Sequence, residues 1–347
     1  MDKATNAAST IAINNLQPSR FPAIRVRIVV AGAAIVALAL VPLAAILLGQ
    51  PYYVTLVSRI MIFALAAVGL NLVLGYGAMV SFGHALYIGI GAYAVGILSS
   101  YGVTNGWAHL ATALGVGLVS AILIGLVCLR SSGVAFIMIT LAFAQMFFFL
   151  AVSLKQFGGD EGLPLNTRSE FGLVDLGNNV ALYYVIFGAL VGTLYAFHRL
   201  VHAKFGMVLR GCKMNERRMS AIGFPTLRYR LTAYVISALV CVVAGVLLAN
   251  LTKFVSPSYM QWTVSGELIV MVVLGGMSTL MGPVIGAAVW LILEELLSSA
   301  KLGLPGGIDE LFSTHWLGLM GLFVLIVTLA LKQGLYGYLV GREGRAS

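Results

Sequence analysis

The sequence carries very little charge for its length. Only 10% of its 347 residues are Asp, Glu, Lys or Arg, whereas about a quarter of the residues of an ordinary globular protein are charged. Apolar residues make up 60% of the chain. A soluble fold cannot cover its surface with so few charges, and the same composition excludes a disordered, collagen-like or disulfide-stapled secreted chain. The sequence therefore predicts a polytopic membrane protein.

The chain also lacks the signatures of metal, nucleotide and nucleic-acid chemistry. Its three cysteines, Cys128, Cys212 and Cys241, have neither metal-site nor disulfide spacing. The sequence contains no phosphate-loop, zinc-protease or dinucleotide-binding motif. No stretch away from the membrane flanks combines dense Lys and Arg with aromatic residues, as nucleic-acid binding requires. We therefore expect no catalytic residue, metal or cofactor, and no nucleic-acid partner. If nucleotide drives transport here, another chain must hydrolyse it.

Long apolar runs fill most of the sequence. A helix needs about 20 apolar residues to cross the hydrocarbon core. The candidate spans are 28–48, 55–75, 80–100, 108–129, 133–154, 181–201, 231–251, 267–281, 283–298 and 314–332. The first is too long for a signal-peptide core, so we expect it to remain uncleaved. The eighth and ninth are short and could form two short helices, a broken helix or a re-entrant pair. We expect an all-α bundle of about 8–10 transmembrane helices.

The basic residues predict the orientation of these spans. With a cytoplasmic N-terminus and ten crossings, 16 of the 21 Lys and Arg residues fall on one side. The five on the other side are Arg59, Lys155, Arg168, Lys253 and Lys301. Because cytoplasmic loops are enriched in Lys and Arg, both termini are expected in the cytoplasm.

The same orientation divides the chain into segments. We expect a cytoplasmic N-terminal tail over 1–27, a transmembrane domain over 28–335 and a cytoplasmic C-terminal tail over 336–347. Within the membrane domain, 155–180 forms an outer loop and 199–230 a cytoplasmic loop.

Residues 206–222 of the cytoplasmic loop have the pattern of one amphipathic helix. At 100° per residue, Val208, Cys212, Met219 and Ile222 share a narrow sector, opposite a cationic stripe. Gly223 is expected to end this helix. Such a helix could rest on anionic headgroups or insert into a groove of a soluble partner. In the second case Glu216, the lone acid in the loop, would pair with an arginine of that partner.

Several segments, in order, resemble the LivM-type permease subunit of branched-chain amino acid ABC importers. They are GLNLVLGYG (69–77), SFGHA (81–85), GIGAY (89–93), GGDEGL (158–163), NERR and AIG within 205–234, and VLGGM within 265–286. The resemblance covers about residues 55–335, which is nearly the whole membrane region. It implies a transport subunit of the bacterial inner membrane that is not itself an enzyme, with 155–180 on the periplasmic side.

The resemblance also implies partners. These are a second, LivH-type permease subunit, two cytoplasmic ATPase subunits, a periplasmic substrate-binding protein and the surrounding membrane lipid. The cytoplasmic helix would transmit ATPase closure to the spans. The residues expected to couple the ATPase are Arg210, Lys213, Asn215, Glu216, Arg217, Ala221 and Gly223.

A few polar and glycine residues within the spans are candidates for the substrate pathway. They are Asn71, Ser81, His84, Gly275 and Gly276. Glycine-interrupted helices can expose backbone groups to a passage, but small residues with Asn or Ser also serve helix–helix packing. Both interpretations remain open.

The other charged sites have two interpretations as well. Asp160 and Glu161, in the periplasmic loop, either dock the binding protein or form a solvated turn. Arg59, Glu267, Glu294 and Glu295 fall near the ends of the predicted spans, where long side chains can reach the interface.

The function that these features favour is uptake of amino acids, branched-chain ones first, by an ATP-driven importer. Within that class, a permease for urea, other amides or aromatic acids is the alternative. From other classes, an ATP-independent channel or ion-coupled carrier, or a purely structural membrane protein, stays open. A carrier usually needs an acid or histidine chain at mid-membrane, and His84 is the one deep candidate.

Overall fold

The computed structural model describes residues 52–165, 167–172, 176–299, 316–330 and 334–341, together with 32, 36–43, 45, 49 and 50. The α-helices are α3 (Tyr52–Asn71), α4 (His84–Ser100), α5 (Gly106–Cys128), α6 (Val134–Ser153), α7 (Asn179–His202), α8 (Lys204–Ala221), α9 (Thr226–Thr252), α10 (Trp262–Gly275), α11 (Gly282–Ser299), α13 (Trp316–Ala330) and α14 (Gly334–Gly341). The shorter elements are η1 (Leu72–Tyr76), η2 (Lys155–Phe157), η3 (Pro257–Met260), β1 (Leu163–Pro164) and β2 (Phe254–Val255).

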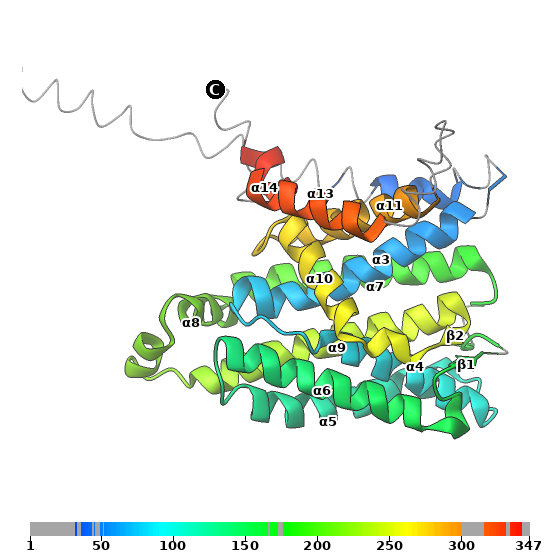
Figure 1. Ribbon diagram of the computed structural model, residues 1–347, viewed down its shortest axis with the longest axis horizontal. Coiled ribbons are helices and arrows are strands. Elements are labelled where there is room, and N and C mark those ends of the chain that lie inside the picture. Colours follow the sequence, from blue (N-terminus) through cyan, green and yellow to red (C-terminus); the bar gives the residue numbers. More distant parts are fainter. Residues whose placement is uncertain are drawn as a thin grey trace, which may run out of the picture.

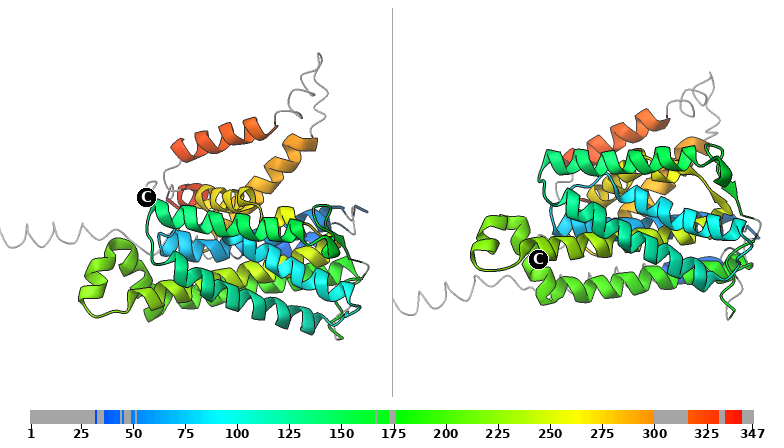
Figure 2. Two further views of the ribbon diagram at one scale, coloured as in Figure 1. Left: turned by 60° about the horizontal axis from the view of Figure 1, so that its bottom comes forward. Right: turned by 90° about the horizontal axis from the view of Figure 1, so that it is seen from below.

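The chain folds as a polytopic helical membrane protein, as the composition predicts. Five of the described helical segments are long and apolar enough to cross a membrane: α3 with η1, α5, α6, α7 and α9. Their axes run roughly along the long dimension of the molecule (Figure 1). Helix α8 projects beyond one end of this bundle, called here the α8 end. Strands β1 and β2 lie at the opposite end, called here the β end, and pair there in antiparallel fashion. Figure 2 shows the same arrangement from two further sides.

Part of the predicted membrane domain and both tails cannot be compared with the structure. The predicted N-terminal tail over 1–27 lies outside the described residues, and so do residues 342–347 and Lys301. Of the first predicted span, residues 36–43 form a helical stretch whose backbone accepts a hydrogen bond from the Tyr183 hydroxyl of α7. Helix α14 falls mostly in the predicted C-terminal tail and packs against α10 and α11.

Helix α9 is the centre of the bundle and contacts α3, α4 and α5. Two glycines permit the close crossing of α4 and α9. A Cβ at Gly245 would lie 1.9 Å from the Ile88 carbonyl oxygen, and one at Gly91 would lie 2.1 Å from the Val242 carbonyl oxygen. Side chains at these positions would push the two helices apart.

We therefore expect Gly245→Val to prevent accumulation of the folded protein. The added side chain meets backbone that cannot move aside, and overpacking of a dense core costs at least about 1–3 kcal/mol. The matched control is Gly188→Val in α7, because a Cβ there meets nothing within 4 Å. Size-exclusion chromatography of detergent extracts measures the amount of folded, monodisperse protein for each variant. Equal monodisperse peaks from the two variants would contradict the proposed packing.

Two irregular segments enter the bundle and shorten the helices that follow them. Segment 77–83 precedes α4, and segment 253–261 precedes α10. The second runs beside α4, with Val255 packed near Gly96 and Met260 near Gly89. Gly89 is eleven residues before the end of α4 at Ser100, so Met260 lies about 16 Å from the β end by the helical rise of α4. Helix α10, which follows Met260, therefore begins inside the bundle.

The predicted boundaries of these two helices are thus wrong. Helix α4 begins at His84 rather than residue 80, and α10 covers Trp262–Gly275 rather than 267–281. The alternative of two short helices is the one found, with α10 and α11 joined by a tight turn over 276–281.

Candidate functional site

Helix α8 is not one straight helix. Asn215 has extended backbone angles, φ −160° and ψ 99°, and divides it in two. The Asn215 side-chain oxygen accepts a hydrogen bond from the Arg218 N–H at 2.9 Å, so this residue caps the second part. That part folds back until Met219 lies against Gly211. The prediction of a single helix with one continuous apolar stripe is wrong, because the asparagine cap breaks it.

The end of α8 follows the prediction. Gly223 has φ +96°, a left-handed conformation suited to glycine. The N–H groups of Gly223 and Phe224 bond to the carbonyls of Ser220 and Met219, which is the pattern of a glycine-terminated helix.

Lys213 ties the first part of α8 to the membrane helices. Its Nζ donates to the Gly75 carbonyl at 2.7 Å and lies 3.1 Å from Ser278 Oγ. Ser278 Oγ donates to the same Gly75 carbonyl at 2.6 Å. One ammonium group thus joins α8 to the end of η1 and to the α10–α11 turn.

Asn71 holds that turn from the other side. Its Nδ2 donates to the Thr279 carbonyl at 2.7 Å, and its Oδ1 accepts from the Ser278 N–H at 3.1 Å. Gly275 packs directly on α11, where a Cβ would lie 1.8 Å from the Gly282 carbonyl oxygen. Asn71, Gly275 and Gly276 therefore meet at one place, as part of a packed turn.

A second tie runs through Glu216 in the other half of α8. Both of its carboxylate oxygens lie 2.7 Å from Nη1 of Arg230, near the start of α9. The guanidinium is nine-tenths buried, and its Nε donates to the Met79 sulfur at 3.3 Å. The structure thus supplies within the chain the arginine that the sequence led us to expect from a soluble partner.

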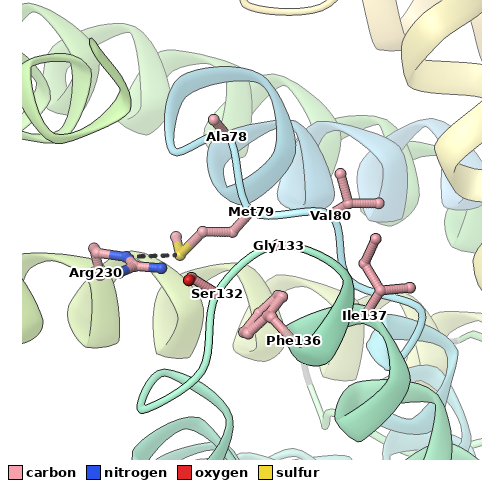
Figure 3. Close-up of a pocket in the computed structure, with 8 residues that line it drawn as sticks. All are labelled: Ala78, Met79, Val80, Ser132, Gly133, Phe136, Ile137 and Arg230. Atoms are coloured by element: carbon pink, nitrogen blue, oxygen red, sulfur yellow. Dashed lines mark hydrogen bonds between the residues drawn. The ribbon is translucent and has the colours of Figure 1, made fainter. Parts of the chain in front are cut away.

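Arg230 and Met79 border a small cavity of about 70 Å³ at the α8 end (Figure 3). The cavity is enclosed by three segments: 78–80, the loop and first turn around the start of α6, and α9. Its lining residues are Ala78, Met79, Val80, Ser132, Gly133, Phe136, Ile137 and Arg230. The irregular segment 77–83 is therefore in contact with both Arg230 and, through the end of η1, Lys213.

The remaining residues of the predicted coupling set differ in accessibility. Arg210 bonds back to the Gly206 and Val201 carbonyls at 3.2 and 3.1 Å, so it fixes the α7–α8 corner. Arg217 and Ala221 are exposed. Five of the seven predicted coupling residues thus stabilise the conformation and position of α8. They are Arg210, Lys213, Asn215, Glu216 and Gly223.

Five large apolar side chains are exposed on α8 and on the residues that follow it. Met214, at the break in the helix, is 89% exposed, and Ile222, before the glycine stop, is 65% exposed. Met207, Phe224 and Leu227 are also exposed. These five residues are called the α8 tip.

Ser81 and His84 lie at a separate place, at the start of α4. The His84 ring nitrogens are each 2.9 Å from a hydroxyl, Nδ1 from Ser81 and Nε2 from Ser237. Ser237 Oγ donates to the Gly69 carbonyl at 2.6 Å, so it accepts from a protonated Nε2. His84 is fully buried and both of its ring nitrogens have partners, which suits a structural rather than a proton-carrying histidine.

The backbone at the start of α4 is satisfied by hydroxyl groups from three elements. The N–H groups of Phe82, Gly83 and Ala85 donate to Thr140, Ser81 and Ser265, respectively. Thr140 and Ser265 come from α6 and α10. These hydroxyls stabilise an irregular segment inside the membrane, where an unsatisfied N–H is costly.

Asp160 and Glu161 lie at the β end. Both are exposed, in a turn between Gly159 and Gly162, which have φ +51° and +84°. The turn leads directly into β1. The two carboxylates therefore project from a turn that the β1–β2 pair holds in place.

Glu267 has a different setting from the one the sequence suggested, whereas Arg59 and Glu294 lie toward the ends of their helices. Glu267 is five residues into α10, and α10 begins inside the bundle, so Glu267 is not near a membrane surface. Arg59 and Glu294 form an ion pair with Nη2 and Oε1 3.3 Å apart. The sequence placed Glu267 at the start of a span, because composition does not show the packing beside α4 that sets the depth at which α10 begins.

The described residues contain no cluster of three or more His, Cys, Asp or Glu side chains that could hold a metal ion. The functional groups that the structure does assemble are hydrogen-bonding and charged side chains at the α8 end and inside the bundle.

Comparison with known proteins places this architecture in a family context. Residues 52–329 match the family model described as branched-chain amino acid transport system / permease component. LivM of Salmonella typhimurium, a high-affinity branched-chain amino acid transport system permease protein, is 26% identical over 268 residues, which cover 70% of this chain and 63% of LivM. The chain thus matches less than two thirds of that relative's length.

Two other relatives are matched over most of their length. A probable branched-chain amino acid transport permease protein LivM of Methanocaldococcus jannaschii is 25% identical over 81% of this chain and 93% of its own. The LivH permease protein of Escherichia coli is 26% identical over 79% of this chain and 91% of its own. No solved structure matches the chain.

Proposed function

Since the chain belongs to the family of branched-chain amino acid transport system permease components, we propose that it is a membrane subunit of an ATP-driven importer of these amino acids. It would assemble with a LivH-type second permease, two cytoplasmic ATPase subunits and a periplasmic binding protein. The α8 end would face the bacterial cytoplasm and the β end the periplasm, with both termini cytoplasmic. This orientation agrees with the excess of Lys and Arg in 199–230.

The observation that carries the proposal is the exposed apolar α8 tip. Met214 and Ile222 are exposed, and helix α8 projects beyond the end of the membrane bundle (Figure 1). Large apolar side chains exposed on a projecting helix are typical of a surface that another protein covers. Flexible Met side chains are well suited to filling a groove. The α8 tip is thus the surface on which an ATPase subunit would dock.

The ties of α8 supply a route for the ATPase motion. Lys213 links α8 to η1 and to the α10–α11 turn, and Glu216 links it to Arg230 at the start of α9. A displacement of the tip would therefore act on segment 77–83, through Arg230 and Met79, and on the α10–α11 turn over 276–281. Substrate would enter from the binding protein at the β end, where Asp160 and Glu161 offer carboxylates to basic residues.

Site-specific cross-linking tests the docking surface. Met214→Cys, treated with a short bifunctional thiol reagent in the assembled importer, should form a cross-link to a cysteine placed in the groove of the ATPase subunit. The native cysteines are buried, and burial together with the Glu216 charge raises the pKa of the Cys212 thiol, so background reaction should be small.

The matched control is Tyr101→Cys, which is 66% exposed at the β end. It should give no cross-link to the ATPase. Equal cross-linking from Tyr101→Cys, or none from Met214→Cys in an importer that hydrolyses ATP, would refute α8 as the docking element.

A further inference from the structure

Three charged side chains of α3, α10 and α11 lie within the thickness of the membrane. Arg59 is seven residues from the start of α3, about 10 Å below the β end. Glu267 is eight residues, about 12 Å, from the α8 end of α10, and Glu294 is twelve residues, about 18 Å, from the α8 end of α11. A hydrocarbon core about 30 Å thick includes all three.

These residues form one group, called here the charged cluster. Arg59 Nη2 is 3.3 Å from Glu294 Oε1, and its guanidinium lies over the Phe63 ring at 5.8 Å from the centroid. Glu267 interacts electrostatically with both Glu294 and Arg59. Helices α3, α10 and α11 pack against one another, which keeps the cluster together.

The charged cluster is accessible from outside the chain. The side chain of Arg59 is 42% exposed and that of Glu294 is 23% exposed. Charged groups at this depth almost always face protein or a water-filled cavity rather than lipid. In contrast, the exposed positions of α5 and α6 are overwhelmingly apolar, for example Leu123 and Phe149. The α3–α11 face therefore carries charged groups where the exposed faces of α5 and α6 carry none.

The cluster has spare capacity for a polar ligand. Its two carboxyl groups and one guanidinium offer a ligand both hydrogen-bond acceptors and donors. Trp290 is four residues before Glu294 and so lies on the same face of α11. Its buried indole N–H has no hydrogen-bond partner among the described residues.

We propose that the charged cluster is where the zwitterionic backbone of the transported amino acid passes through the membrane. The ammonium group would lie between Glu267 and Glu294, and the carboxylate on Arg59. The ammonium and carboxylate groups of an amino acid are attached to the same carbon. They can therefore pair at once with neighbouring charged groups of both signs, whereas one charged side chain of a partner protein could pair with only one of them. The inference rests on the proposed function and assigns it a substrate contact.

Ligand binding to the assembled complex in nanodiscs, without the periplasmic binding protein, tests the inference. The probes are leucine, leucinamide, which lacks the carboxylate charge, and 4-methylpentanoate, which lacks the ammonium. Binding is followed by scintillation proximity and by Trp290 fluorescence, with Trp290→Phe removing the fluorescence response. Glu267→Gln and Glu294→Gln should each raise the half-saturating leucine concentration at least tenfold. Arg59→Met should abolish the preference for leucine over leucinamide, and Arg59→Lys should retain part of it.

Glu295→Gln is the matched control, because Glu295 neighbours Glu294 on α11 and interacts with Tyr52 nearer the β end. It should bind leucine as the unmodified complex does. Unchanged leucine binding in Glu267→Gln and Glu294→Gln would overturn the proposal. The proposal would also be overturned if the Arg59→Met complex lost the second permease subunit but still bound leucine. That result would show that the cluster is a contact between subunits. Neither result bears on whether uptake requires ATP, so failure of the proposed function is seen separately.

Discussion

Replacement of Lys213 by methionine is expected to separate ATP hydrolysis from transport. The lysine donates to the Gly75 carbonyl and contacts Ser278, so it joins α8 to the end of η1 and to the α10–α11 turn. Methionine keeps much of the length but cannot donate. A hydrogen bond to a charged group contributes about 1.5–3 kcal/mol. Because Lys213 is exposed, we expect its hydrogen bond to contribute a free energy at the lower end of this range. Leucine uptake per ATP hydrolysed should fall about tenfold.

The measurement is uptake and ATPase activity on the same proteoliposomes. Arg217→Met is the control, because Arg217 is a nearby exposed cation in the other part of α8. Its ratio of uptake to hydrolysis should match that of the unmodified importer. A parallel loss of both activities in Lys213→Met would show instead that this residue serves ATPase docking.

The second large effect is expected from Glu216→Lys. Arg230 is nine-tenths buried and has Glu216 as its carboxylate partner. A lysine would place a second positive charge beside it, and removing one partner of a buried ion pair costs about 3–5 kcal/mol. Because the Glu216 side chain is 43% exposed, we expect about 1–2 kcal/mol here. Thermal unfolding should shift down by several degrees, and uptake should be lost.

The reversed pair Glu216→Arg with Arg230→Glu should recover part of both losses. Glu161→Lys is the control for the change of charge alone, since Glu161 is exposed at the other end of the bundle. Its melting temperature should stay within one degree of the unmodified protein, which is about the precision of the measurement. An unfolding temperature for Glu216→Lys equal to that of Glu161→Lys would contradict the pairing.

The sequence was sufficient for the class of fold and for the longest helices. Apolar runs of about 20 residues predict α5, α6, α7 and α9 closely, because a membrane-spanning helix is recognisable from its own composition. The starts of α4 and α10 could not be predicted in this way. The backbone N–H groups at the start of α4 depend on hydroxyls of Thr140 and Ser265, which come from distant parts of the chain. The start of α10 depends in turn on the packing of 253–261 beside α4.

The candidate site shows the same division. The position of the α8 helix and its end at Gly223 follow from amphipathic spacing and glycine chemistry. Its break at Asn215 could have been found, since asparagine is a strong helix cap. Arg230 was counted as one more cytoplasmic charge, because a charge count along the sequence carries no information on burial.

The most direct test of the proposed function is leucine uptake by proteoliposomes that contain this chain with its co-expressed partners. We expect radiolabelled leucine uptake only when ATP and the binding protein are both present. Stimulated ATP hydrolysis without leucine uptake would keep the importer and exclude this substrate. Uptake that continues without ATP would contradict the assignment to an ATP-driven importer and identify a channel or an ion-coupled carrier.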